Sequence, residues 1–147
     1  MAAGVSLSHC ADVLERPFRA IIFDWDGTAV VHRAEDATPL AERVAALLRL
    51  RVWIVVVTGT HFGHIDRQLC RHLAPSIRRY LLVCTNRGSE VYGFDRHGTV
   101  VRRWCRLATP QEEQQLTAIA EAVRDQLVAR TGLEIGIVYD RLNRRKI

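Results

Sequence analysis

The 147-residue sequence has no long hydrophobic run, which excludes an ordinary membrane-spanning helix. Such a helix needs about 20 consecutive apolar residues, and the apolar stretches here, such as residues 52–57, are much shorter. Residues 1–10 have neither a basic start nor a long apolar segment, so they do not predict a secretory signal. We therefore expect a cytoplasmic protein with no membrane partner.

Closely spaced cysteines are absent, so the sequence has no pair with the spacing of metal ligands. The four cysteines are Cys10, Cys70, Cys84 and Cys105. We expect reduced, mostly buried thiols rather than a disulfide framework. His61 and His64, with Asp66 nearby, have no further ligand placed with them, so they do not predict a zinc site.

Lysine is almost absent. Of the 21 basic residues, Lys146 is the single lysine and the others are arginines. The net charge of +5 raises the question of nucleic-acid binding. The arginines are scattered along the chain, however, and no recognition motif accompanies them. We therefore expect no nucleic-acid partner. A hydrophobic content of 48% with 25% charged residues is typical of a globular chain with one core, or a core and part of a second domain.

Residues 1–86 alternate between strand and helix patterns. Apolar strands are expected at residues 19–24, 52–57 and 80–84. Helices are expected between them, one capped by Thr38 with apolar positions Leu40, Val44, Leu47 and Leu48, and one with Ile65, Leu69 and Leu73 on one face. This order predicts an α/β fold with a Rossmann-like, doubly wound parallel sheet and right-handed crossovers.

The pattern changes after residue 84. Residues 90–94 and 99–104 flank a turn and predict an antiparallel hairpin. Thr109-Pro110-Gln111-Glu112 is a capping box, and it begins an apolar-faced helix (Leu116, Ile119, Val123, Leu127) that Gly132 ends. A further strand is expected at residues 133–139. We place a boundary at residues 86–89, between a core (1–86) and a partial α+β cap domain (87–147).

Two carboxylates stand where the first strand ends. Asp24 and Asp26 are one residue apart, so in an extended chain they point to the same side. Open α/β sheets bind ligands at the carboxyl ends of their strands, where two such groups can share a divalent cation or act as nucleophile and proton donor. Gly27 and Thr28 then permit a tight exit turn. Asp24 and Asp26 are therefore the candidate catalytic and metal-binding residues.

The second strand ends in Thr58-Gly59-Thr60. A hydroxyl in this position, followed by free amides at Gly59 and Thr60, suits phosphate oxygens. Thr-Gly alone is a common turn. Beside Asp24 on a neighbouring strand, it predicts that Thr58 and Gly59 bind a phosphate that faces a carboxylate nucleophile and a cation.

The run Asp24-Trp25-Asp26-Gly27-Thr28 resembles the first signature of the haloacid dehalogenase-like (HAD) phosphatases, and Thr58 resembles their second. The resemblance covers residues 18–95. Residues 85–91 resemble the junction at which trehalose-phosphate phosphatases, phosphomannomutases and Cof-like sugar phosphatases insert a cap, although Arg87 separates two residues that are adjacent in the Cof-like pattern. Only about 30 residues separate Asp26 from Thr58, which one helix and its loops use up, so the cap follows the third strand.

The resemblance implies phosphoryl transfer in two steps. Asp24 would form an aspartyl-phosphate, Asp26 would protonate the leaving oxygen and then activate water, and Thr58 would bind the phosphoryl group. The Asp24 carboxylate and the Asp26 carbonyl would hold Mg²⁺. The implied function is Mg²⁺-dependent hydrolysis of a phosphate monoester, a small sugar phosphate.

The sequence departs from this family in lacking the lysine and the acidic loop that follow the cap. Lys146 and Asp140 both lie in the expected cap. Either the chain is an N-terminal portion of a longer protein, or it is a short descendant that has lost these motifs. In both cases an exposed sheet edge would allow self-association.

Hydrolysis has three rival functions. A phosphomannomutase-like transfer uses the same first motifs, and a non-catalytic remnant would only bind phosphorylated ligands or a protein. A signalling receiver domain is disfavoured, because it needs an aspartate at the end of the third strand, where Cys84 stands. The resemblance implies that Trp25 and the loop with His32 face the substrate, and packing is the alternative for Trp25. Arg144 and Arg145 are expected on a solvated face, with contact to a substrate's phosphate or sugar from the cap as the alternative.

Overall fold

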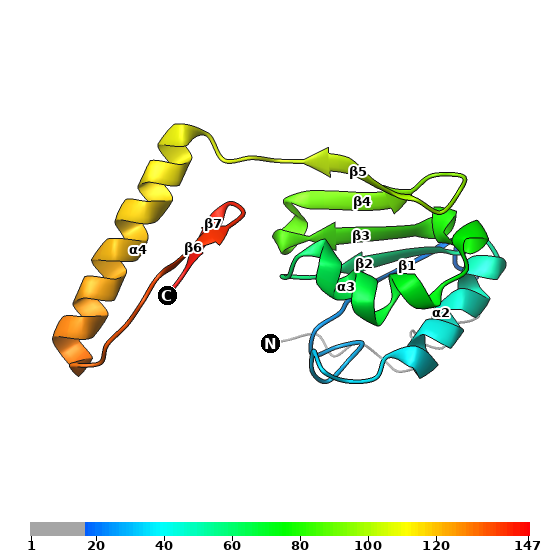
Figure 1. Ribbon diagram of the computed structural model, residues 1–147, viewed down its shortest axis with the longest axis horizontal. Helices are drawn as coiled ribbons and strands as arrows, with labels where there is room; N and C mark the ends of the chain where they lie inside the picture. The colour runs from blue at the N-terminus through cyan, green and yellow to red at the C-terminus, as the bar shows by residue number, and fades with distance from the viewer. Residues whose placement is uncertain (1–16) are drawn as a thin grey trace, which may run out of the picture.

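A computed structural model describes residues 17–147 and shows a mixed five-stranded sheet with helices (Figure 1). The strands are β1 (Ala20–Asp24), β2 (Trp53–Val57), β3 (Leu81–Thr85), β4 (Glu90–Phe94) and β5 (Val100–Cys105), in that spatial order. β1, β2 and β3 are parallel, whereas β4 and β5 are antiparallel to their neighbours. The predicted α/β class is confirmed.

The two crossover helices lie on the same face of the sheet. They are α2 (Thr38–Arg49) and α3 (Phe62–Gln68), and α2 contacts the 3₁₀ turns that follow α3. β1, β2 and β3 stand side by side in chain order, so right-handed crossovers place both helices on one side. A doubly wound sheet carries helices on both faces, whereas in residues 17–147 these helices cover one.

The face of the sheet that the helices cover is buried. Ile54 and Val56 of β2, with Leu81 and Val83 of β3, are fully buried there. Ile22 of β1 projects from the other face and is 67% exposed. The register aligns residue 24 with 57 and residue 57 with 84, so the parallel strands end level and their loops share one edge.

The helix expected through Leu73 is shorter than predicted. α3 ends at Gln68, and 3₁₀ turns at Cys70–His72 and Pro75–Tyr80 continue the chain. Ile65, Leu69 and Leu73 are nevertheless all buried. The apolar spacing thus identified the buried positions, although the backbone leaves the helical conformation at Leu69 (φ −126°).

The helix starts follow local hydrogen bonds. Thr38 is the first residue of α2 rather than its cap, and the Asp36 side chain accepts a bond from the Thr38 amide (2.9 Å). The capping box of α4 (Pro110–Thr131) is confirmed, because Thr109 Oγ1 accepts from the Glu112 amide and the Glu112 carboxylate accepts from the Thr109 amide.

The strand predicted at residues 133–139 is largely wrong. Residues 132–137 have no regular structure, and a hairpin of β6 (Val138–Arg141) and β7 (Arg144–Lys146) ends the chain. Asn143 adopts a left-handed backbone (φ 52°) in the turn, a conformation that asparagine tolerates well. The Asn143 side chain also bonds the Ala108 amide and the Arg106 carbonyl, each at 2.6 Å.

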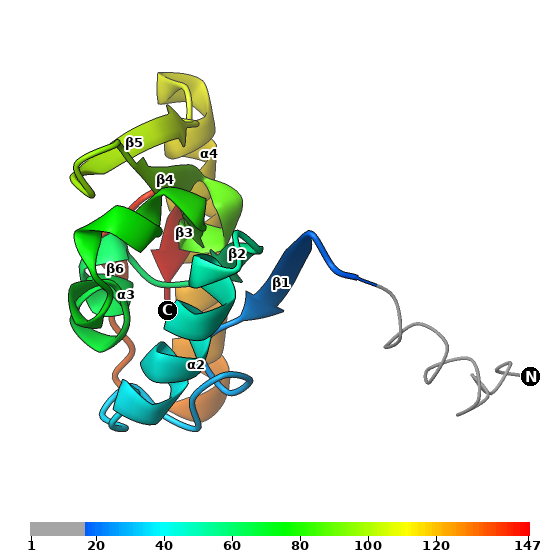
Figure 2. The same ribbon diagram turned by 90° about the vertical axis from the view of Figure 1, so that its right-hand side faces the viewer.

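The five-stranded sheet runs across the boundary expected at residues 86–89. β4 pairs with β3 and β5 pairs with β4, so residues 90–105 extend the core sheet rather than begin a separate layer. In Figure 1, α4 stands apart from the sheet and the β6–β7 hairpin lies between them. Figure 2 shows α4 behind the strands of the sheet. The division into a core (1–86) and a cap (87–147) remains a prediction.

Candidate active site

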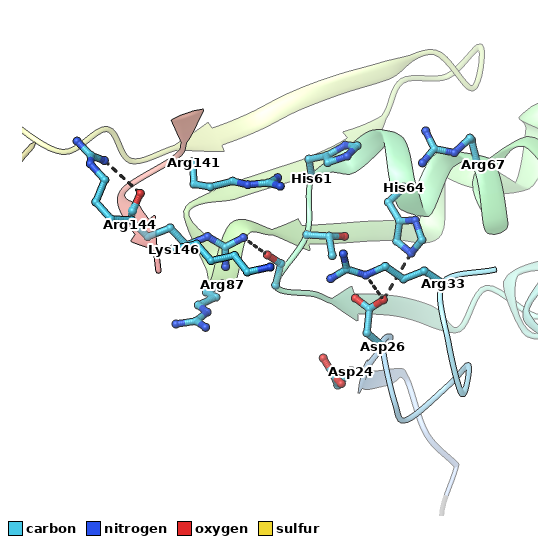
Figure 3. A pocket seen from close by; sticks show the side chains of 13 residues that line it. Asp24, Asp26, Arg33, His61, His64, Arg67, Arg87, Arg141, Arg144 and Lys146 are labelled. Carbon is cyan, nitrogen blue, oxygen red and sulfur yellow. Dashed lines mark hydrogen bonds and ion pairs between the residues drawn. The ribbon is translucent and has the colours of Figure 1, made fainter. Parts of the chain in front are cut away.

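A cavity of about 650 Å³ opens at the carboxyl ends of β1 and β2 (Figure 3). Asp24 and Asp26 line it, as do Gly59 and Thr60 from the second strand end. The β6–β7 hairpin supplies a further wall. The two strand ends that the sequence singled out therefore meet at one cavity.

Asp24 is the open carboxylate of the pair. It is the last residue of β1 and is exposed to the cavity. Its side chain accepts a hydrogen bond from the Thr28 hydroxyl (3.2 Å). A carboxylate held by one neighbour and open on its other side is accessible to an incoming electrophile.

Asp26 is held more closely. Its Oδ2 accepts a hydrogen bond from Thr58 Oγ1 (2.9 Å), and its Oδ1 lies 3.3 Å from Arg33 Nε and 3.5 Å from His64 Nε2. The Asp26 side chain retains 25% exposure. These contacts fix its orientation while leaving it access to the cavity.

Thr58 lies beneath the cavity wall rather than on it. It is 1% exposed, and its hydroxyl contacts Asp26 and Thr60. The Thr60 amide, expected to be free, donates to Thr58 Oγ1 (3.1 Å), because a strand-end hydroxyl readily bonds the backbone two residues on. The role of Thr58 and Gly59 in phosphate binding remains a prediction.

His64 is a site residue that the sequence analysis did not identify. It lies on α3 and is buried, although surface exposure is usual for histidine near a helix start. Burial and the positive charges of Arg33 and Arg67 lower its pKa and outweigh the opposing effect of Asp26. A neutral imidazole therefore faces Asp26 near pH 7. The signal in the sequence was its position next to buried Ile65.

Trp25 serves packing, which resolves one of the alternatives left open by the sequence. It is fully buried, and its indole N–H donates to Gln68 Oε1 (2.8 Å). Gln68 in turn donates to the Glu35 carbonyl (3.1 Å), which ties the loop after β1 to α3. His32 is exposed and does not line the cavity.

A buried carboxylate fixes the loop after β3. Glu90 accepts side-chain hydrogen bonds from Thr85, Asn86, Tyr92 and Arg102. Burial alone would raise the pKa of Glu90, but these bonds together lower it.

The same loop is also fastened to the end of β2. The Asn86 amide donates to the Thr60 carbonyl (2.9 Å), and the Arg87 amide donates to the Thr58 carbonyl (3.1 Å). The loop therefore presents Arg87 to the cavity from a fixed backbone.

Comparison with solved structures identifies the fold. IMP-bound IMP-nucleotidase of Plasmodium falciparum matches with a TM-score of 0.64 and 16% identity, over 85% of this chain and 38% of that one. The ATP-bound form gives 0.65 and 15%, over 85% and 34%. The chain has a haloacid dehalogenase-like fold. It spans between a third and two-fifths of the length of these structures.

The similarity to other known proteins is weaker or absent. A HAD-superfamily phosphatase of Bacteroides thetaiotaomicron matches with 19% identity over 74% of this chain and 36% of that one, but with a TM-score of only 0.42. No family model matches the sequence. No curated protein matches it either.

Within this HAD-like fold, the cationic wall of the cavity is the part that the sequence analysis missed. Arg141, Arg144 and Lys146 extend from the β6–β7 hairpin towards the strand ends (Figure 3). Arg144 Nη2 donates to the Gly59 carbonyl (2.8 Å) across 85 residues of sequence. The sequence favours a solvated face for Arg144 and places Lys146 in the expected cap, without assigning either residue to this cavity. Only the hairpin and its docking bring them to the site.

The acidic side of the site consists of Asp24 and Asp26. In the described part of the chain, no group of three or more His, Cys, Asp or Glu residues could hold a metal ion. Asp140 is exposed on β6 and does not line the cavity.

No helix among residues 17–147 is long and apolar enough to cross a membrane.

Proposed function

We propose that this chain carries the catalytic core of a phosphatase that hydrolyses a phosphate monoester, such as a sugar phosphate, with Mg²⁺. The observation that carries the proposal is the placement of Asp24 and Asp26 on one cavity at a strand end, opposite a cationic wall. IMP-nucleotidase, by its name, acts on a nucleoside monophosphate, which is also a phosphate monoester. The shared fold supports the same reaction class.

Asp24 is the nucleophile in this proposal. Its exposed carboxylate oxygen bonds to phosphorus while the bond from phosphorus to the leaving oxygen breaks. Asp26 gives a proton to that oxygen. In the second step water attacks the phosphorus of the aspartyl-phosphate while its bond to the Asp24 oxygen breaks. Asp26 accepts the water proton, which restores the one it gave in the first step, and inorganic phosphate leaves. Thr58 and Arg33 hold Asp26 in place through both steps.

The acidic pair fits Mg²⁺ as a partial ligand set. Magnesium usually binds one or two carboxylates together with water and substrate phosphate oxygens, so a third acidic residue is not required. The Asp24 carboxylate and the Asp26 backbone carbonyl would hold the ion. When bound, it offsets the negative charge of the carboxylate and the phosphoryl group.

Asp24→Asn tests the proposal. With p-nitrophenyl phosphate and Mg²⁺, we expect hydrolysis to fall at least about a hundredfold, because an amide cannot form the acyl-phosphate. Millimolar Mg²⁺ should also raise the melting temperature of the wild-type chain but not of the variant. Asp140→Asn is the matched control and should leave both readouts unchanged.

The outcomes separate the rival functions. Hydrolysis by Asp24→Asn within about tenfold of the wild type would reject Asp24 as nucleophile. A wild-type chain that shows the Mg²⁺ shift but no turnover would favour a non-catalytic remnant that binds phosphorylated ligands. Transfer of phosphate to a sugar instead of water would favour the phosphomannomutase-like rival.

A further inference from the structure

The cavity carries far more positive than negative charge. Seven of its lining side chains are cationic, whereas Asp24 and Asp26 are its only acidic ones. Arg33 pairs with Asp26, and Arg145 pairs with Glu113 of α4. The other five have no ionic partner among residues 17–147: Arg67, Arg87, Arg141, Arg144 and Lys146.

The strongest imbalance lies between the β6–β7 hairpin and the loop after β3. The Nε atoms of Arg141 and Arg144 are buried, and neither has a hydrogen-bond partner in the described part of the chain. Burial lowers the pKa of Arg144, and the positive charges of Arg87, Arg141 and Arg33 lower it further. Like charges gathered in a partly buried place cost free energy unless an anion lies among them.

A purely structural role does not explain this group. Arg145, the next residue, shows what such a role looks like here, because it bonds Glu113 and the Thr117 hydroxyl and so fastens the hairpin to α4. Arg144 makes one bond to the Gly59 carbonyl, which neutralises no charge.

We infer that Arg87, Arg141 and Arg144 form a second anion site, which binds a phosphate or carboxylate of the substrate other than the phosphate that reacts at Asp24. The substrate class is thus a small phosphate monoester with a second anionic group. This inference rests on the proposed function only in naming the ligand a substrate. Guanidinium groups suit this task because their paired N–H donors match the oxygens of phosphate and carboxylate.

The size of the cavity is consistent with such a ligand. A volume of about 650 Å³ lies within the range of small-molecule sites. The reacting phosphate and the second anion would occupy opposite walls, one at the strand ends and one at the hairpin. A single phosphate would leave one of the two walls without a partner.

Binding to three related probes tests the inference. Glycerol 3-phosphate has one anionic group, 3-phosphoglycerate adds a carboxylate, and 2,3-bisphosphoglycerate adds a second phosphate as well. Calorimetry is done on the full chain carrying Asp24→Asn, with EDTA present, so that neither turnover nor metal contributes. We expect both probes with more than one anionic group to bind at least about tenfold more tightly than glycerol 3-phosphate.

Substitution of the arginines should remove that preference. Arg141→Gln with Arg144→Gln should bring the three affinities within about twofold, and Arg87→Gln, which leaves the hairpin intact, should reduce the difference in the same direction. Arg49→Gln, which removes the same single charge as Arg87→Gln but at the end of α2 and outside the cavity lining, should retain it. Melting curves confirm that each variant is folded.

Two results would overturn the inference. One is equal affinity for all three probes in the Asp24→Asn chain whose arginines are unchanged. The other is a single-stranded oligonucleotide that binds more tightly than the bisphosphate and depends on the same arginines. Because the assay needs no hydrolysis, a chain that binds as expected but does not turn over p-nitrophenyl phosphate would contradict the proposed function alone.

Discussion

Glu90 shows how one buried carboxylate positions part of the cavity without touching it. Its hydrogen bonds to Thr85 and Asn86 hold the turn that presents Arg87. A buried charge is costly unless it is fully bonded, and here four side chains share that task. The wall of the site therefore depends on a residue of the adjoining strand.

The ionisation of Glu90 predicts a pH-dependent stability. The pKa of Glu90 is lower in the folded chain than its ordinary value of 4.5, so its ionised form stabilises the fold above about pH 4.5. This contribution is lost as the pH falls through the lower, folded value. We expect Glu90→Gln to cost about 1–3 kcal/mol at pH 7 and less at pH 3.5, measured by urea unfolding.

Glu42→Gln is the control for this prediction, because Glu42 is exposed on α2. It should change the free energy of unfolding little at either pH. A Glu90→Gln variant that loses the same stability at both pH values would show that packing, and not ionisation, is what Glu90 contributes.

At the residue scale, the sequence identified the groups that lie next to each other along the chain. Asp24 and Asp26 were found because alternation and the strand end place them together. His64 and Arg144 were not, because their approach depends on how α3 and a distant hairpin dock onto the strand ends. Local patterns contain no information about such contacts.

At the scale of elements, α4 combines a strong start with an unburied side. The capping box satisfies backbone donors at its first turn, and Gly132 ends it in a left-handed conformation (φ 68°). Its apolar positions are largely exposed, with Ile119 at 63%, and only Ala120 is buried. The sequence predicted both ends of this helix correctly. The partial cap expected from the sequence also predicts an apolar helix face that lies exposed, as the structure shows.

Loss of the cap should therefore weaken α4 noticeably. Because little packing supports the helix, we expect Thr109→Ala to cost about 1 kcal/mol and to increase amide exchange in its first two turns. Hydrogen exchange by mass spectrometry measures this directly. Gln114→Ala, on the same helix but without a capping role, should not increase exchange. Equal protection in Thr109→Ala and wild type would contradict the importance of the cap.

The β6–β7 hairpin could not be predicted from sequence periodicity, because its strands are short. Its strands have four and three residues, too few for an apolar alternation to emerge. The turn residue Asn143 was the available signal, because asparagine favours left-handed positions. The apolar residues before Asn143 instead predict one longer strand, at residues 133–139.

At the scale of the whole molecule, one face and two edges of the sheet carry exposed apolar side chains. β1 and β5 are the outer strands. Ile22 on β1 is 67% exposed and Trp104 on β5 is 49% exposed. Apolar side chains beside unpaired strand edges are a common surface for association.

We expect the chain to self-associate when it is made alone. Sedimentation at increasing concentration should show species larger than a monomer, and Ile22→Glu should shift them towards the monomer by placing a charge on the edge strand. Leu133→Glu, which changes an exposed apolar residue outside the sheet, is the control. A monomer at all concentrations would contradict this expectation.

The left-handed backbone of Arg87 (φ 58°) means that folding and binding favour different residues at this position. Folding alone favours glycine or asparagine, which adopt that conformation at lower cost. An anion site favours a long cation. Arginine at position 87 is thus a compromise, and a lineage that no longer bound the anion would drift there towards glycine or asparagine while keeping the same fold.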